Sequence, residues 1–304
     1  MAHEAGTTTP IHTSVLLREI VSWAPANTTR ILDATLGLGG HAHALLSAHP
    51  SATLLGFDRD EQALEFAAKR LAMFGDRVDL RHGDFRDELD EVREQSLSYA
   101  LADLGVSSLQ LDAPDRGFSF RFDAPLDMRM DPSSGRSASD ILNTASEKGL
   151  EHILAEFGEE PKARTIARAI VMERRSRGPW TTTRFANIVR RDARGRPGID
   201  PATRSFQALR IATNSELEGL EVGIGRLARC LHQGGRLAVI AFHSLEDRIV
   251  KMAFRSLKSS GDFDVLTPKP LVPQADETGA NPRSRSAKLR VVERRRSATL
   301  GATS

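Results

Sequence analysis

The chain has 304 residues, of which 40% are hydrophobic, and a formal net charge of +2. This length allows one large domain or a domain with an insertion, and this composition is sufficient for a hydrophobic core. The single cysteine, Cys230, excludes an intrachain disulfide and a cysteine-based metal site. No signal-peptide pattern and no stretch long enough to span a bilayer is present, so we expect a cytoplasmic protein.

Apolar segments and helical patterns alternate through the first third of the chain. A run such as Thr53 to Asp58 is short, apolar and rich in leucine, and an amphipathic helical pattern follows it. This alternation predicts a parallel sheet with helical crossovers. We predict strands over residues 30–34, 53–58, 78–82 and 99–104, and helices over residues 12–21, 41–48 and 60–74.

The alternation stops after residue 104, and residues 114–210 show helical periodicity without a strand pattern. This region is expected to be a mainly helical insertion, over residues 113–211, in a discontinuous α/β domain of residues 1–112 and 212–304. Residues 267–285 are rich in Pro, Gly, Ser and Asn and predict a mobile loop. Beyond the insertion we predict helices over 215–231 and 244–257, a turn at Gly234-Gly235, and strands over 236–242, 262–266 and 288–293.

A glycine-rich turn follows the first predicted strand. Gly37, Gly39 and Gly40 allow the backbone to turn sharply and to approach a ligand where a Cβ atom would clash. The next predicted strand ends in Asp58, at the spacing from which a carboxylate accepts hydrogen bonds from a ribose. The turn alone fits NAD and S-adenosylmethionine equally, and it is also compatible with a tight turn that binds nothing.

The number of strands separates these two cofactors. Seven strands, with the last two antiparallel, suit a methyltransferase sheet better than a six-stranded dehydrogenase sheet. The predicted fold is therefore an α/β, doubly wound, seven-stranded sheet like that of class I methyltransferases, with an inserted helical domain.

Candidate site residues follow the ends of the other predicted strands, because ligands of open parallel sheets bind there. Phe85 is placed to contact an adenine ring. Asp103 follows an apolar strand and needs a donor when buried. His243 is a candidate general base, but the following Ser244 and Asp247 resemble a helix cap, which would give this segment a structural role. No His, Asp or Glu cluster has metal-ligand spacing, and no metal requirement is expected.

Two segments are strongly basic. Residues 162–210 contain 13 Lys or Arg and three acidic residues, a net charge of +10. Residues 281–304 contain seven basic residues and one acidic residue, or +6. Arginine dominates both segments and suits phosphate contacts, so a polyanionic partner is indicated. Solvated helix faces are the alternative interpretation.

These motifs together resemble one family, the bacterial 16S ribosomal RNA cytosine-N4 methyltransferases that use S-adenosylmethionine. The resemblance extends from about residue 12 to residue 294. The matching runs are His12 to Leu17, Asp33 to His41, Asp103 to Asp112, Arg116 to Phe120, Pro125 to Asp131, Gly158 to Glu160, Phe206 to Arg210, Asn214 to Leu217 and Phe242 to Lys251.

The resemblance implies methylation of the exocyclic N4 of a cytidine in the decoding region of 16S rRNA, in the small ribosomal subunit. The insertion would recognise RNA, and the chain would act as a monomer or a homodimer. The cofactor-binding residues it implies are Gly37, Gly39, Gly40, His41, Asp58, Phe85, Asp103 and Gln110.

For catalysis we expect Asp103, or the backbone near Ser107, to accept a hydrogen from the amine, with His243 close to the base. Many amino-methyltransferases have two prolines and an aromatic residue after the fourth strand, and this chain lacks them. The expected substrate-binding residues are Asp127, Arg129, Arg210 and Asn214. An RNA-binding ribosome-assembly factor that retains the methyltransferase fold is the alternative function, and a dehydrogenase is a weaker one.

Overall fold

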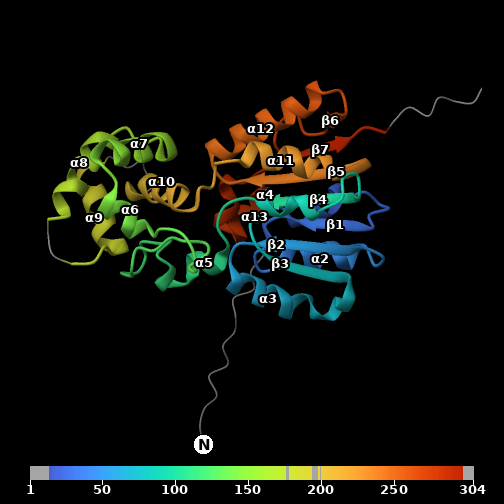
Figure 1. Ribbon diagram of the computed structural model, residues 1–304, viewed down its shortest axis with the longest axis horizontal. Helices are drawn as coiled ribbons and strands as arrows, with labels where there is room; N and C mark the ends of the chain where they lie inside the picture. Colours follow the sequence, from blue (N-terminus) through green and yellow to red (C-terminus); the bar gives the residue numbers. More distant parts are fainter. Residues whose placement is uncertain (1–13, 176–177, 194–197, 199, 297–304) are drawn as a thin grey trace, which may run out of the picture.

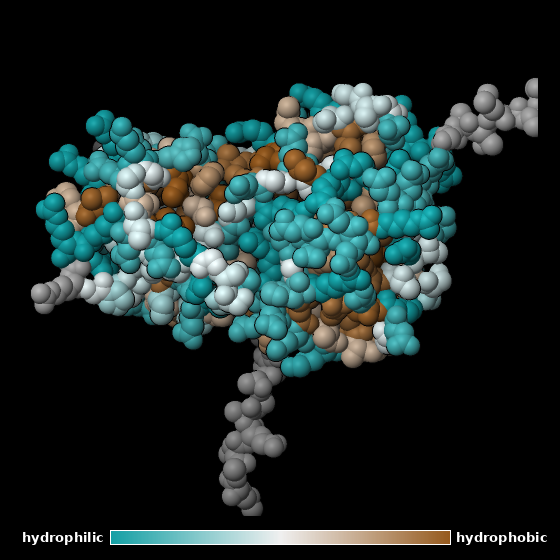
Figure 2. Space-filling model, viewed as in Figure 1, coloured by the Kyte–Doolittle hydropathy of each residue, from teal (hydrophilic) through white to brown (hydrophobic). Residues whose placement is uncertain are grey.

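The computed structural model describes residues 14–175, 178–193, 198 and 200–296. Figure 1 shows two lobes side by side: a sheet with helices on both faces, and a cluster of helices formed by the middle of the chain. None of the described helices is long and apolar enough to cross a membrane. On the face seen in Figure 2, hydrophilic residues cover most of the surface and hydrophobic residues form smaller patches.

The sheet has the seven strands that the sequence predicts, in the order β3-β2-β1-β4-β5-β7-β6. Strands β1 to β5 pair in parallel, and β7 is antiparallel to both of its neighbours, β5 and β6. The strands are β1 (Arg30–Asp33), β2 (Thr53–Asp58), β3 (Val78–His82), β4 (Leu97–Asp103), β5 (Leu231–Ala241), β6 (Phe263–Val265) and β7 (Lys288–Arg294).

Successive residues of the central strands enter two different cores, because side chains alternate across a strand. In β4, Ala100 and Ala102 pack in a core with α4 (Phe85–Glu88), α11 (Leu220–Arg229) and α12 (Ser244–Ser259). Tyr99 and Leu101 face the other core.

That second core includes α1 (Leu17–Trp23), α2 (Gly40–Ala48) and α3 (Glu61–Leu71). Helices therefore cover both faces of the sheet, which confirms the doubly wound α/β prediction.

The helical lobe has a third, separate core. Phe185 and Ile166 are fully buried in it, and Phe120 packs edge-to-face on Phe206 with ring centroids 4.8 Å apart. Phe122, by contrast, is 57% exposed. Between β4 and α11 the helices are α5 (Ser108–Asp112), α6 (Ala138–Thr144), α7 (Glu147–Gly158), α8 (Ala163–Glu173), α9 (Thr182–Asp192) and α10 (Ala202–Asn214), with a short 3₁₀ turn at η3 (Pro114–Arg116). Two other 3₁₀ turns, η1 (Ala72–Arg77) and η2 (Leu89–Glu91), precede β3 and β4 in the sheet lobe.

A buried ion pair joins the two lobes. Arg116 Nη2 lies 2.8 Å from Asp60 Oδ2, and the same nitrogen donates to the carbonyl of Met130 at 2.8 Å. Asp60 is completely buried and its Oδ1 accepts from the amide of Gln62, at the start of α3. The start of α3 in the sheet lobe thus holds the segment that leads into the helical lobe.

Two predicted boundaries near β5 are wrong. The helix expected over 215–231 begins only at Leu220 and ends at Arg229, because Leu231 already pairs with Leu97 in the sheet. The predicted turn at Gly234-Gly235 lies inside β5, where Gly234 has a φ of 79° and the register with β4 shifts. The glycines therefore form an irregularity within a strand rather than a turn before it.

The segment predicted as a mobile loop, residues 267–285, contains ordered structure. It forms α13 (Ala275–Ala280) and most of η4 (Pro282–Ser286). The carboxylate of Glu277 accepts from the amide of Leu16 at 2.7 Å, so α13 is tied to the start of α1. These tertiary contacts outweigh the low helix propensity of the segment. The N-terminal helix, expected from residue 12 with Thr13 or Ser14 as its cap, begins at Leu17 instead: Leu16, with a φ of 53°, precedes α1 without a side-chain cap, and His12 and Thr13 lie outside the described residues.

Candidate active site

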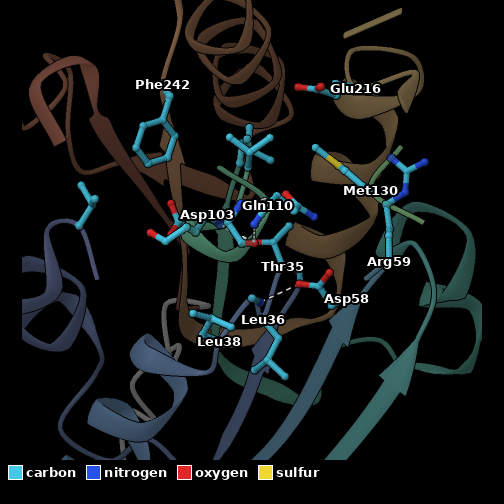
Figure 3. A pocket seen from close by; sticks show the side chains of 18 of the residues that line it. Thr35, Leu36, Leu38, Asp58, Arg59, Asp103, Gln110, Met130, Glu216 and Phe242 are labelled. Atoms are coloured by element: carbon cyan, nitrogen blue, oxygen red, sulfur yellow. Dashed lines mark hydrogen bonds between the residues drawn. The ribbon is translucent and has the colours of Figure 1, made fainter. Parts of the chain in front are cut away.

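A pocket opens at the carboxyl ends of β1, β2 and β4, where the topology predicts a ligand site. Residues of the glycine-rich turn, of the segment after β4 and of the end of β5 line it. Figure 3 shows Asp58, Thr35 and Asp103 at the strand ends, with Phe242 and Glu216 across the pocket. Both lobes contribute, since Met130 and Arg210 also line the pocket.

The glycine-rich turn has the conformation that its sequence requires. Gly37 and Gly39 have φ angles of 53° and 72°, which favour glycine. A Cβ atom on Gly37 would meet no protein atom within 4 Å, so its backbone is open to a ligand. On Gly40, the first residue of α2, a Cβ atom would clash with Ser14 Oγ, so this glycine permits close packing of the chain behind the turn.

Asp58 is held at the bottom of the pocket by backbone amides. Its Oδ2 accepts from Gly37 N at 2.6 Å, and its Oδ1 accepts from Asp60 N at 2.8 Å. Burial raises the pKa of Asp58 to about 6, although these amides favour the ionised form. Each carboxylate oxygen retains acceptor capacity, so Asp58 is suited to bind hydroxyl groups of a ribose.

Asp103 lines the pocket with a side chain that is 25% exposed, and Asp33, which is 1% exposed, lies close to it. Asp103 Oδ1 and Asp33 Oδ2 are both buried without a hydrogen-bond partner among the described residues. Burial raises the pKa of Asp33 to about 7 and that of Asp103 well above its usual value, with a further contribution from the charge of Asp33. His41 Nδ1 lies 3.6 Å from Asp103 Oδ2. A cationic ligand would satisfy this acidic pair.

Phe85 and Asp84 line the pocket at the start of α4. Phe85 is 4% exposed, and its ring packs against α11 at Gly223. Asp84 caps α4 by accepting from the amide of Arg86 at 2.9 Å, and Arg86 Nη2 lies 2.5 Å from its Oδ2. Asp84 thus combines the helix-cap role with a place at the pocket wall.

Ser107 and Gln110 build a capping box at the start of α5, and both line the pocket. The Gln110 side chain accepts from Ser107 N at 3.0 Å and donates to Asp60 Oδ2 at 2.9 Å. Gln110 therefore joins the segment after β4 to the buried Asp60–Arg116 ion pair.

His243 caps α12 rather than lining the pocket. Its Nδ1 accepts from Glu246 N at 3.3 Å, and the Glu246 carboxylate accepts from the amides of Phe242 and His243. The predicted cap at Ser244 is thus off by one residue. Phe242, which precedes His243, and Glu246, one turn into α12, are the residues of this motif that line the pocket.

Glu216 lies close to this cap and reveals a cluster that sequence spacing did not predict. One side-chain ligand atom from each of Glu216, His243 and Glu246 lies within 4.8 Å of the others, as in a metal site. However, Arg210 Nε and Nη2 donate to the two oxygens of Glu216, each at 2.8 Å. The guanidinium thereby supplies the positive charge that this acidic cluster requires.

Of the four residues predicted to bind substrate, only Arg210 lines the pocket. Asn214 is 4% exposed: its Oδ1 accepts from Met130 N and its Nδ2 donates to the carbonyl of Met128, both at 2.7 Å. Asp127 accepts from Arg129 Nε at 2.8 Å, in the segment leading to Met130. Asn214 thus positions this segment, and the pair of Asp127 and Arg129 lies outside the pocket wall.

Several pocket residues were not assigned to the site from the sequence, namely Arg59, Arg86, Met130, Glu216, Glu246 and Arg283. Of these, Met130, Glu216 and Glu246 lie in the runs that carry the family resemblance. Arg59 directly follows Asp58, so the position after a strand end was an available signal. Arg283 is different, because no local pattern indicates that η4 returns to the pocket.

The comparisons with known proteins agree with this architecture. The model of the MraW methylase family matches residues 9–295. The chain is 47% identical to ribosomal RNA small subunit methyltransferase H of Maridesulfovibrio salexigens, over 93% of this chain and 95% of that protein. It is 45% identical to the protein of the same name from Geobacter sp. strain M21, over 93% and 98% of the two chains. With the Cyanothece sp. PCC 7425 protein, also of that name, it shares 50% identity over 86% and 87%. The sheet, the pocket at its strand ends and these matches together show that the chain belongs to the MraW methylase family.

Proposed function

We propose that this chain transfers a methyl group from S-adenosylmethionine to the exocyclic N4 of a cytidine in the decoding region of 16S rRNA. The family and the names of the relatives support rRNA methylation. The observation that carries the proposal is the carboxylate of Asp103, at the end of β4 beside the glycine-rich turn, whose buried Oδ1 lacks a partner among the described residues. A sulfonium cofactor and an amine substrate both offer what this carboxylate lacks.

The pocket residues fit S-adenosylmethionine. Asp58 would bind the ribose hydroxyls and Phe85 would pack on the adenine. The open backbone at Gly37 and the side chain of His41 would lie against the methionine portion. When bound, the cofactor supplies a methyl group already activated by its positively charged sulfur.

The protein's main catalytic task is orientation, because the cytosine amine is weakly nucleophilic and the methyl group is already activated. Asp103 accepts a hydrogen bond from the amine, which aims the nitrogen lone pair at the methyl carbon. The backbone near Ser107 is a second acceptor beside it. The amine loses one proton as the new N–C bond forms, and the carboxylate of Asp103 is suited to take it.

Arg210 and His243 act on the substrate side of the pocket in this proposal. Arg210 and Glu216 form an ion pair at the pocket wall. The guanidinium has more N–H groups than the two Glu216 oxygens use, and the others can donate to the base. His243 holds Glu246 through the cap of α12, and its effect on the base is exerted through that carboxylate. Asp127, Arg129 and Asn214 hold the segment around Met130, which joins the pocket to the helical lobe.

The helical lobe is proposed as the RNA-recognition domain, over residues 113–211, inserted into a methyltransferase domain of residues 1–112 and 212–304. Its separate core supports this division. Lys162, Arg164 and Arg168 are exposed on and beside α8 and are available for phosphate contacts. The predicted basic segment also includes Arg177, Arg194 and Arg196, which lie outside the described residues.

We expect the chain to act in the cytoplasm on the small ribosomal subunit, as a monomer or a homodimer. The alternative, an assembly factor that only retains the fold, is not favoured, because the glycine-rich turn and Asp58 keep a geometry suited to a cofactor.

The proposal is tested with purified protein, methyl-labelled S-adenosylmethionine and small ribosomal subunits that lack the modification. We expect label in the 16S rRNA with the unaltered protein and a loss of at least about tenfold in turnover with Asp103→Ala at saturating cofactor. Unchanged turnover of this variant would remove Asp103 from the mechanism. Absence of label despite measured cofactor binding would favour the assembly factor.

A further inference from the structure

The methionine portion of S-adenosylmethionine carries a carboxylate, and the pocket has acidic groups but few cations on that side. Asp103, with Asp33 close to it, suits the positive sulfonium and ammonium groups and would repel the carboxylate. A carboxylate bound next to these acids needs a charged donor, and arginine matches it best. The lining of the pocket includes Arg59, Arg86, Arg210 and Arg283.

Three of these arginines lie on the side of Asp84 and Glu216. Arg86 pairs with Asp84, and Arg210 is bound to both oxygens of Glu216. Arg59 donates to the carbonyl of Asn214 at 2.8 Å, and its Nε lies 3.5 Å from Asp84 Oδ2. These three cations therefore surround the part of the pocket assigned to the adenine and the base.

Arg283 lies on the other side, in the segment wrongly predicted as a mobile loop. Figure 1 shows α13, which precedes it, at the end of the sheet that faces the helical lobe. Contacts connect this segment to His41: Glu277 of α13 accepts from Leu16 N at 2.7 Å, and the carbonyl of the adjacent Val15 lies 2.9 Å from His41 Nε2. Arg283 and His41 both line the pocket.

Asp112, at the end of α5, holds the guanidinium of Arg283. Arg283 Nη1 donates to Asp112 Oδ2 at 3.0 Å, and Nη2 donates to Asp112 Oδ1. A guanidinium has more N–H donors than one carboxylate can use in this geometry. Arg283 can therefore bind a second carboxylate while Asp112 keeps it in place.

We propose that Arg283 binds the α-carboxylate of S-adenosylmethionine and that Asp112 is its positioning residue. This inference rests on the cofactor of the proposed function. It assigns the η4 segment a role in selecting a cofactor that carries a free carboxylate, beside the contact of the preceding α13 with Leu16.

The test compares the binding of two ligands by isothermal titration calorimetry on the full chain, without RNA. Decarboxylated S-adenosylmethionine keeps the sulfonium, the amine and the nucleoside but lacks the carboxylate. We expect Arg283→Ala to bind S-adenosylmethionine about tenfold more weakly than the unaltered protein, since a charge-assisted hydrogen bond is lost. Its affinity for the decarboxylated ligand should change by less than about twofold.

Arg285→Ala is the matched control, because Arg285 lies in the same 3₁₀ turn, is exposed and does not line the pocket. Its affinities for both ligands should equal those of the unaltered protein. Equal weakening of both ligands by Arg283→Ala would mean general damage to the segment and would overturn the inference.

Unchanged affinity of Arg283→Ala for S-adenosylmethionine would also overturn it. If that variant instead bound small-subunit RNA more weakly, Arg283 would be an RNA-phosphate contact. Failure of the unaltered protein to bind S-adenosylmethionine at all would contradict the proposed function itself, so the two failures are distinguishable.

Discussion

Asp58 is the residue on which the affinity for the cofactor most depends in this account. The backbone amides of Gly37 and Asp60 fix its carboxylate at the bottom of the pocket. Asp58→Ala removes charge-assisted hydrogen bonds to the ribose, and we expect the affinity for S-adenosylmethionine to fall by about 100-fold in a calorimetric titration. Asp79→Ala, at an exposed position of β3, is the control and should bind normally. Equal affinities of the two variants would refute the ribose assignment.

Asp33 makes the stability of the cofactor-free protein depend on pH. Its pKa of about 7 in the folded protein lies above the ordinary aspartate value of 3.8, because burial disfavours its charge. The folded state therefore binds this proton more tightly, and the stability that Asp33 contributes below about pH 4 is lost as the pH rises towards 7.

Asp33→Asn removes this titration. Between about pH 4 and pH 8, the unfolding free energy of the variant should rise relative to that of the unaltered protein by up to about 4 kcal/mol. Urea titrations of both proteins across this range measure the difference. A difference that does not change with pH would contradict the burial of an ionisable Asp33.

At the scale of single elements, variants of His243, the cap of α12, distinguish a structural from a catalytic role of this residue. Asparagine is a good N-cap, so His243→Asn should keep the unfolding free energy within about 0.5 kcal/mol, whereas His243→Ala should lose about 1 kcal/mol. If His243 also positions Glu246 for the base, both variants should lose several-fold in methyl transfer at saturating cofactor. Full activity of the asparagine variant would leave the histidine with a capping role alone.

The elements also show what the sequence can and cannot predict. The strand positions followed from apolar runs such as Thr53 to Asp58, because burial on both faces of a parallel sheet demands such runs. Helix α13 could not be predicted, since its order depends on the distant contact between Glu277 and Leu16. The predicted helix before β5 extended too far, to residue 231, because an apolar residue such as Leu231 fits both a helical and a strand pattern.

The sequence predicted the parts of the site that lie in local motifs. Gly37, Asp58 and Asp103 follow strand ends and line the pocket as expected. The Asn214 side chain, by contrast, is occupied by backbone groups of Met128 and Met130, which lie far away in the chain. Such pairings depend on how the two lobes meet, and no local sequence pattern encodes them.

At the scale of the whole molecule, we expect the helical lobe to bind RNA electrostatically. The affinity for small-subunit RNA should fall steeply as the salt concentration rises, because bound counterions are released from the phosphates. Replacing the exposed Arg164 and Arg168 together by alanine should weaken binding and reduce the log-log salt slope by about 2. The matched control replaces the exposed Arg255 and Lys258 of α12. Equal effects of the two double variants would contradict RNA binding by the helical lobe.

The proposed function depends above all on which atom of the RNA receives the methyl group. The most direct measurement is mass spectrometry of nucleosides digested from 16S rRNA, after unmodified small subunits react with the protein and methyl-labelled S-adenosylmethionine. Standards of the methylated cytidines distinguish N4 from the ring positions. We expect label in N4-methylcytidine that disappears with Asp58→Ala. Label at a ring carbon or in another base would contradict the proposed function.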